Sequence, residues 1–286
     1  MNKPQISVLM PIYRTNEQYL RTAIESILSQ SFQDFEFLII DDCPEDDRES
    51  IVKSYQDNRI RYYKNKQNLG ITPTRNKLIE LSKGEYLAIF DHDDISLPTR
   101  LEKQAKYLDE YPEVGVVGCW REDFPQKEIY KFPSSDLEIK TQLMDLCVLT
   151  HSASMIRKSV LDEHNIRYEE EYSPAEDYCL WLRLIEFTNF YNIPEVLFKY
   201  RLHPDNTTKH QQNKMSIATE RLQLWSRNKY PYLYQSYEHT RPTITKIKLL
   251  GIPLFKIFRK GKKIKVYLFN FIPFLSINKK GIIWFK

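Results

Sequence analysis

Three carboxylates within four positions, Asp91, Asp93 and Asp94, follow an apolar run at residues 86–90. Carboxylates this close repel one another, so each destabilises the charged form of its neighbours unless a cation lies between them. Their oxygens suit a hard divalent cation, which keeps open positions for phosphate oxygens. The alternative is a solvated acidic turn at the end of a strand. Whether the three carboxylates form a cation site or a solvated turn depends on which other side chains lie beside them.

A second acidic pair, Asp41 and Asp42, ends another apolar run at residues 35–40. Ligands of parallel α/β sheets bind beyond the carboxyl ends of the strands. We therefore expect both acidic groups at one edge of one sheet, which favours a ligand that carries a metal ion. The chain has no P-loop, no G-x-G-x-x-G and only 7 glycines. Metal and side chains would have to neutralise any phosphate charge.

Apolar runs alternate with segments of helical spacing along the first 118 residues. This alternation predicts a largely parallel α/β sheet. Thr15 or Asn16 is placed to cap the first helix, and Thr72 with Pro73 supplies the cap and first-turn proline of the third. The expected strands are 6–11, 35–40, 60–63, 86–90 and 114–118, and the expected helices are 19–28, 48–55, 72–81 and 97–111.

Residues 118–229 carry weaker patterns. Glu176 and Asp177 open a segment whose apolar residues recur at helical spacing, and the dipole at a helix start favours an anion. A simple N-terminal cap is the alternative role. The other expectations are a loop at 120–133, helices at 137–146, 158–164 and 211–229, a short strand at 154–156 and strand structure at 191–201.

An ordered set of short motifs makes residues 5–205 resemble the family 2 glycosyltransferases. The motifs are Val8–Tyr13, Ser26–Phe32, Ile39–Asp42, Asn68–Gly70 before Thr74–Asn76, Asp91–Asp94, Glu176–Asp177 before Trp181–Arg183, and Tyr200–His203. The resemblance implies a GT-A fold, which is a Rossmann-like, mostly parallel sheet flanked by helices. It implies a catalytic domain at 1–205, with a nucleotide-binding half at 1–118 and an acceptor half at 119–205. A helical segment at 206–240 and a tail at 241–286 would follow.

The resemblance also implies roles for residues on the donor side. Pro11 and Tyr13 would border the nucleotide base, Asp42 would hydrogen-bond it, Arg75 would lie near the base or phosphates, and Asp91 would approach the ribose. Asp93 would bind Mn²⁺ or Mg²⁺ at the diphosphate, and His203 is a second candidate metal ligand. A lone loop histidine is otherwise simply solvated.

On the acceptor side, the resemblance makes Asp177 the general base. Asp94 and Glu176 are neighbours that shape the site, and Trp120, His151 and Tyr172 are candidate acceptor contacts. The implied activity is inverting transfer of a sugar from a nucleotide diphosphate, most simply a UDP-sugar, to a saccharide or lipid-linked acceptor of a bacterial surface glycan. A non-catalytic protein that binds nucleotide or glycan with the same fold is the alternative.

The tail differs in composition from the rest of the chain. Twelve of the 42 Lys and Arg residues lie in 241–286, and no acidic residue follows Glu238. Cations beside Phe, Leu, Ile and Trp are typical of a basic amphipathic segment at an anionic membrane surface. We expect Pro253 and Pro273 to break this segment into short pieces. A cover over the catalytic domain is one alternative; nucleic-acid binding is another, which we do not expect because no recognition module accompanies the tail.

The remaining features indicate the compartment. The four cysteines are widely spaced without a C-x-x-C pair, which fits a reducing environment and argues against a zinc site. We expect no signal peptide at residues 1–5 and no membrane-spanning run. The prediction is a cytoplasmic protein that is peripheral on the inner face of the membrane.

Overall fold

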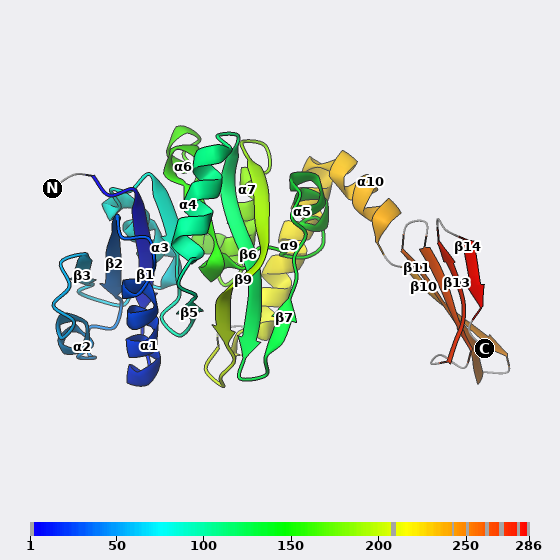
Figure 1. Cartoon of the computed structure of the whole chain (residues 1–286), viewed down its shortest axis with the longest axis horizontal. Coiled ribbons are helices and arrows are strands. Elements are labelled where there is room, and N and C mark those ends of the chain that lie inside the picture. The colour runs from blue at the N-terminus through cyan, green and yellow to red at the C-terminus, as the bar shows by residue number, and fades with distance from the viewer. Residues whose placement is uncertain are drawn as a thin grey trace. The chain divides into compact units, whose positions relative to one another are not determined.

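The computed structural model describes residues 3–206, 210–241, 243–249, 252–260, 263–268, 272–278 and 281–284. The chain divides into two compact units, residues 1–226 and 227–286. The first unit is a layered α/β structure, and the second carries an antiparallel sheet (Figure 1). Each unit is described separately below.

A nine-stranded sheet forms the centre of the first unit. β1 (Ile6–Ile12) is buried along its whole length and lies parallel between β2 (Phe35–Asp41) and β4 (Tyr86–Ile89). β3 (Ile60–Lys64) extends the parallel set beside β2. The carboxyl ends of β2 and β4 therefore lie at one edge of the sheet, which confirms the placement expected for the two acidic groups.

The other half of the sheet mixes strand directions. β8 (Met155–Arg157) runs antiparallel between β4 and β6 (Val114–Phe124), and β6 pairs in parallel with β9 (Asn189–Arg201). The short β5 (Ile95–Ser96) follows the acidic turn directly and pairs antiparallel with residues 198–199 of β9. This pairing carries the end of β9 to the acidic turn.

Helices pack on both halves of the sheet (Figure 1). α3 (Ile71–Leu81) packs against β1 and β2, and α4 (Arg100–Glu110) packs against β6, β8 and β9. The other helical elements of this unit are α1 (Glu17–Leu28), α2 (Glu49–Lys53), α5 (Asp136–Gln142), η1 (His151–Ala153), α6 (Lys158–Glu163), η2 (Glu170–Tyr172), α7 (Glu176–Leu184) and most of α9 (Gln212–Lys229); α10 (Pro231–Thr240) belongs to the second unit. The predicted α/β architecture is confirmed.

Two local predictions fail and one alternative is resolved. Asn16 caps α1, because its Oδ1 accepts hydrogen bonds from the backbone N–H groups of Gln18 and Tyr19. The third helix begins at Ile71 behind Gly70, which has φ 88°, so Thr72 lies inside the first turn. The loop expected at 120–133 is wrong: β6 continues to Phe124 and pairs with β7 (Glu128–Tyr130). The charged composition of this end of β6 did not indicate a strand. It forms one because it pairs with β9.

The second unit contains a five-stranded antiparallel sheet in sequential order. Its strands are β10 (Thr243–Leu249), β11 (Ile252–Lys260), β12 (Lys263–Leu268), β13 (Ile272–Asn278) and β14 (Gly281–Trp284). The two prolines expected to break the tail lie inside β11 and β13. The register shifts opposite each of them, at Ile247/Lys248 and Val266/Tyr267. Bulges of this kind tolerate a residue that cannot donate a ladder hydrogen bond.

We predict that Gly84→Ala destabilises the catalytic unit. A Cβ at this position would lie 2.4 Å from the backbone nitrogen of Ser7 and 2.7 Å from the carbonyl carbon of Ile6, so β1 would have to shift, at a cost of about 1–3 kcal/mol. Urea unfolding measures the loss. The exposed neighbour provides the control, since Lys83→Ala should unfold like the wild type. Equal stability of the two variants would contradict this packing.

Candidate active site

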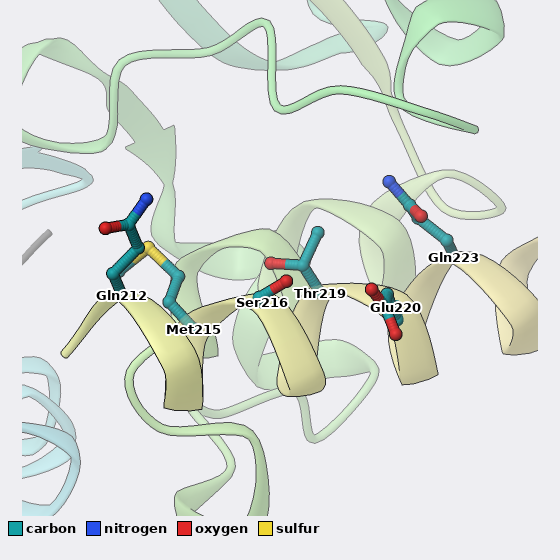
Figure 2. Close-up of a pocket in the computed structure, with 6 residues that line it drawn as sticks. All are labelled: Gln212, Met215, Ser216, Thr219, Glu220 and Gln223. Atoms are coloured by element: carbon teal, nitrogen blue, oxygen red, sulfur yellow. The ribbon is translucent and has the colours of Figure 1, made fainter.

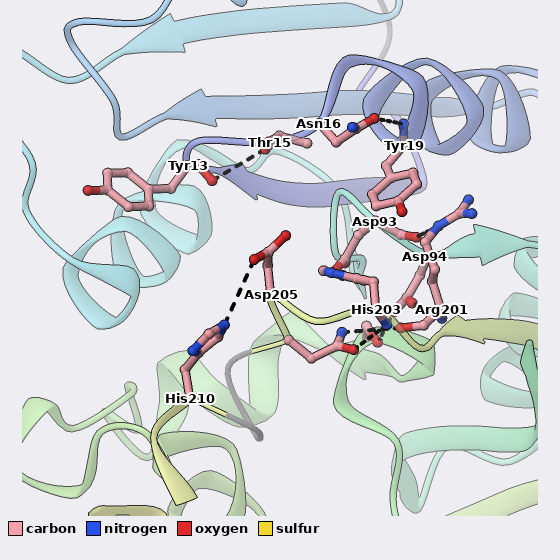
Figure 3. Close-up of polar contacts among 12 residues, drawn as sticks. Tyr13, Thr15, Asn16, Tyr19, Asp93, Asp94, Arg201, His203, Asp205 and His210 are labelled. Carbon is pink, nitrogen blue, oxygen red and sulfur yellow. Dashed lines mark hydrogen bonds and ion pairs between the residues drawn. The ribbon is translucent and has the colours of Figure 1, made fainter.

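The acidic turn and the end of β9 are joined by Arg201 and His203 (Figure 3). His203 Nε2 lies 2.8 Å from Asp93 Oδ2, and Arg201 Nε donates to the backbone carbonyl of Asp93 at 2.7 Å. The Arg201 guanidinium lies between the rings of Tyr19 and Phe124, at 4.3 and 4.5 Å from their centroids. The two predicted metal ligands are therefore adjacent, and Arg201 fixes the turn that carries one of them.

Asp94 is fully buried beside this pair. Its two oxygens accept hydrogen bonds from the backbone N–H of Arg201 at 2.8 Å and from Ser152 Oγ at 2.9 Å. Burial, together with the charges of Asp93 and Asp91, holds the pKa of Asp94 well above its ordinary value. Asp94 thus joins the acidic turn to β9 and η1.

A single guanidinium links the donor-side acids to the acids of α7. Arg75 Nη1 lies 2.5 Å from Glu176 Oε1, and Nη2 lies 3.4 Å from Asp91 Oδ1. Burial opposes the charge of Arg75, but Asp91 and Glu176 outweigh it and raise its pKa. Arg75 Nε and Glu176 Oε2 are buried without a hydrogen-bond partner among the described residues. Unpaired buried polar atoms are costly, and a polar ligand would satisfy them.

Asp177 lies next to this ion pair at the start of α7. Its Oδ1 accepts the N–H of Tyr178 at 2.7 Å, but the N-cap residue of α7 is Ala175, which makes no side-chain cap hydrogen bond. Burial, with the neighbouring charge of Glu176, raises the pKa of Asp177 to about 6, although Arg75 opposes the rise. A carboxylate with this pKa is ionised at neutral pH and is a stronger base than an ordinary aspartate.

Asp42 shapes the other side of the sheet edge. Its Oδ1 accepts from Asn65 Nδ2 at 2.8 Å and from the N–H of Leu69 at 2.9 Å, while Oδ2 accepts the N–H of Gly70 at 2.8 Å. A carboxylate oxygen has two acceptor positions, so Oδ2 keeps one for a ligand. Asp41 instead binds Tyr62 and the N–H of Cys43, which makes it a structural residue.

The remaining donor-side candidates lie at the end of β1. Pro11 is buried within the strand, whereas Tyr13 immediately after it is 40% exposed. The backbone carbonyl of Tyr13 accepts from Thr15 Oγ1 at 3.5 Å (Figure 3). Because β1 lies between β2 and β4, the exposed ring of Tyr13 extends from the same edge that carries the acidic groups.

The three acceptor candidates have different surroundings. His151 is buried, with Nε2 2.8 Å from the hydroxyl of Tyr168, and burial, with Arg75, holds its pKa well below the ordinary value. Trp120 Nε1 donates to the carbonyl of Phe132 at 3.1 Å. The ring of Tyr172 lies 5.5 Å from the Arg221 guanidinium of α9. Of these three, only His151 is linked to Arg75, through Tyr168.

A hollow of about 370 Å³ follows α9 (Figure 2). Its lining residues share one face of the helix: Gln212, Met215, Ser216, Thr219, Glu220 and Gln223. Arg221 of the same helix forms an ion pair of 2.5 Å with Glu171, five residues before Glu176. None of the predicted site residues lines the hollow, so the hollow is separate from the acidic groups at the sheet edge.

The residues fit a divalent metal only in part. Among the described residues, no three His, Cys, Asp or Glu side chains form a group able to hold a metal ion. Asp93 and His203 supply one carboxylate and one imidazole, a donor set that suits Mn²⁺. Two protein ligands leave most of the coordination sphere to other donors, such as the oxygens of a diphosphate.

Several residues of this site carried no assigned role in the sequence analysis. Arg201 stood within a quoted motif, but nothing in the sequence indicated its stacking between two rings. Tyr168 lies 5.8 Å from the Arg75 guanidinium, and its backbone exchanges two hydrogen bonds of 2.9 Å with Asn76. Tyr168 follows no recognisable periodicity, so only the folded chain reveals it.

The fold is of the GT-A type. Solved structures support the fold: Staphylococcus aureus TarS 1-349 in complex with UDP-GlcNAc has a TM-score of 0.62 at 18% identity, covering 82% of this chain and 77% of that one. The mannosyltransferase PcManGT from Pyrobaculum calidifontis, in complex with GDP-Man and Mn²⁺, has a TM-score of 0.58 at 14% identity and covers 83% and 76%.

The sequence comparisons give the family. The model of glycosyl transferase family 2 matches residues 7–164. An uncharacterized glycosyltransferase of Methanocaldococcus jannaschii is 37% identical over 219 residues, which cover 71% of this chain and 72% of that protein. The chain therefore belongs to glycosyl transferase family 2. The resemblance and the fold predicted from the motifs are both confirmed.

We predict that Asp94→Asn lowers the stability of the protein less than Asp94→Ala does. Asp94→Ala removes the acceptor of two buried donors, at a cost of about 1–3 kcal/mol for each group left unpaired. Asp94→Asn keeps an acceptor for the Arg201 N–H, and its loss of stability should be smaller. Urea unfolding of both variants at neutral pH gives the comparison. The interpretation is wrong if the two variants lose the same stability.

We also predict that the two charged neighbours move the pKa of Asp177 in opposite directions. Arg75→Gln removes a cation that favours the carboxylate, so the pKa should rise above about 6; Glu176→Gln removes a like charge and should lower it. Carbon-13 NMR titration of labelled aspartate reads the values. Arg183→Gln on the same helix is the control and should leave them unchanged. A shift in the same direction for Arg75→Gln and Glu176→Gln would contradict the geometry.

Proposed function

We propose that this protein is a metal-dependent, inverting glycosyltransferase that moves a sugar from a nucleotide diphosphate donor to a saccharide or lipid-linked acceptor. The observation that carries the proposal is Arg75, which bridges Asp91 and Glu176 beside an aspartate of raised pKa. The Arg75 guanidinium thus connects Asp91, on the nucleotide side, to Glu176, which lies beside the proposed general base Asp177. Such a link suits a reaction in which donor and acceptor must be held together.

Asp177 is the proposed general base. An acceptor hydroxyl must lose its proton as it attacks the anomeric carbon, and a base works best when its pKa lies near the working pH. The Asp177 carboxylate takes that proton, while Arg75 holds Glu176 beside it. Only one carboxylate then acts opposite the leaving group, so a single displacement inverts the anomeric configuration.

Asp93 and His203 are the proposed metal ligands. Asp91 is proposed to contact the ribose and Arg75 the phosphates. The proposed contacts of the base are Asp42, Pro11 and Tyr13. A bound Mn²⁺ or Mg²⁺ supplies stabilisation of the negative charge that develops on the leaving diphosphate. The donor and metal in the PcManGT complex, GDP-Man and Mn²⁺, and the UDP-GlcNAc of the TarS complex support a nucleotide-sugar donor. We propose UDP as the nucleotide.

The proposed setting is bacterial surface glycan synthesis, such as lipopolysaccharide, capsule or O-antigen, at the inner face of the membrane. None of the described helices is long and apolar enough to span a bilayer. Membrane association would therefore be peripheral, through the basic tail at 241–286. The abundance of Lys and Arg there, with no acidic residue after Glu238, supports an anionic lipid surface as partner.

Trp120, His151 and Tyr172 remain the proposed acceptor contacts.

Donor turnover without a known acceptor tests the proposal. UDP-glucose, UDP-galactose, UDP-GlcNAc and GDP-mannose are incubated with the protein and Mn²⁺, and nucleotide release to water is measured. We expect release from one donor. Asp93→Ala should reduce it at least about 100-fold because the metal loses a ligand, and Asp177→Asn should reduce it about 10²–10⁴-fold.

The matched control is Asp205→Asn. Asp205 is 87% exposed and lies two residues after His203. Among the described residues it forms an ion pair with His210 at 3.8 Å (Figure 3), so its variant should release nucleotide at the wild-type rate. Release that survives in Asp177→Asn would remove Asp177 as base. Nucleotide binding with no release from any donor would favour the non-catalytic alternative.

A further inference from the structure

The register of the second unit divides its sheet into two faces. Residues paired across antiparallel strands share a face, and residues two apart along a strand return to it. One row across the sheet holds Thr245, Ile257, Val266, Leu275 and Trp284. The two flanking rows are Thr243, Arg259, Ile264, Ile277 and Ile282, and Ile247, Phe255, Leu268 and Ile272. Apart from two threonines and one arginine, every position of this apolar face is aliphatic or aromatic.

The opposite face carries the lysines. Its rows include Lys246 paired with Lys256, Lys260 paired with Lys263, and Lys265 paired with Ser276. The other paired positions of this lysine face are Ile244, Lys248, Pro253, Phe258, Tyr267, Pro273, Asn278, Gly281 and Ile283. At each bulge, opposite Pro253 and Pro273, one residue of the strand has no partner across the ladder. Beyond that extra residue the strand again alternates between the two faces in step with its neighbour, so the division into faces is preserved. The sheet is therefore amphipathic, which the composition of the tail alone did not establish.

The apolar face needs a cover. Ile257, Ile264 and Val266 of this face are partly exposed, while Lys265 of the lysine face is exposed. A sheet with one apolar face is stable in water only when another layer packs against it. Exposed apolar patches of this kind mark surfaces that bind proteins or membranes.

We propose that the apolar face of β10–β14 inserts into the acyl boundary of an anionic membrane, with the lysine face directed toward the head groups and water. The inference rests on the membrane association within the proposed function and specifies the surface that makes it. Insertion should be shallow, about 5–10 Å. β10 and β14 are the edge strands of the described sheet. The outer backbone groups of edge strands cannot be satisfied by hydrocarbon but can be by head groups and water.

Charge favours a lipid surface over a second copy of the sheet. Two copies packed through their apolar faces would bring together two tails without a single acidic residue after Glu238, and like charges oppose that association. Near an anionic leaflet the same lysines are instead attracted to the head groups. The chemistry that recognises this sheet is therefore an apolar layer bordered by negative head groups.

The test uses the full chain and vesicles of phosphatidylcholine with or without phosphatidylglycerol. We expect sedimentation with the anionic vesicles only, and quenching of tryptophan fluorescence by acyl-brominated lipid that disappears in Trp284→Phe, since Trp284 stands on the apolar face. This readout needs no disruptive substitution. The proposal is overturned if the protein stays in solution, or if it binds without Trp284-dependent quenching.

Paired variants identify the face. Val266→Asn with Leu275→Asn changes one row of the apolar face, and Tyr267→Asn with Ser276→Asn changes adjacent positions on the other face of the same two strands without altering the net charge. The first pair should lower the vesicle partition coefficient at least about tenfold, from the apolar burial lost; the second should change it less than threefold. Equal losses, or a dimer by sedimentation that only the first pair disrupts, would refute membrane insertion.

Thermal stabilisation by UDP with Mn²⁺, measured on the same samples, separates this inference from the proposed catalysis. Loss of vesicle binding with nucleotide stabilisation intact would reject the sheet as the docking element and leave the transferase site standing. Vesicle binding without any nucleotide stabilisation would reject the transferase site and leave the docking surface standing.

Discussion

The site depends on keeping several carboxylates together at one sheet edge, where each opposes the ionisation of the next. Two arginines make this possible in different ways. Arg75 places its charge between Asp91 and Glu176, while Arg201 binds the backbone of the acidic turn and is itself held between two rings. Burial, with the repulsion that remains from Glu176, raises the pKa of Asp177. His203 lies beside Asp93 in the same crowded region, so the crowding that costs stability also suits the proposed base and the proposed metal ligands.

The strand directions explain why these groups converge. β2 and β4 flank β1 in parallel, so Asp42 and the 91–94 turn share one edge. The short antiparallel pairing of β5 with β9 then brings in His203 from a position far along the chain. α7 contributes Asp177 through the contact of Glu176 with Arg75. The proposed metal-assisted transfer would thus depend on residues from separate elements that only the complete sheet brings together.

Much of this could be predicted from the sequence because it depends on local patterns. Buried strands such as 6–12 are continuous apolar runs, the Asn16 cap is local, and the acidic motifs mark strand ends. What could not be predicted depends on distant partners: β6 extends through charged residues because β9 pairs with it, and Tyr168 meets Arg75 without any periodic signal. In the tail, composition gave cations and apolar residues, whereas strand register alone separates them onto two faces.

The most direct test of the central claim is calorimetric titration of the purified protein with UDP and with GDP, each with and without Mn²⁺. We expect one nucleotide to bind in a metal-dependent way, with an affinity that falls at least about tenfold in Asp93→Ala because the metal would lose one of its two proposed protein ligands. Binding of neither nucleotide, or binding that is unchanged by Mn²⁺ and by Asp93→Ala, would contradict a nucleotide-sugar site at this sheet edge.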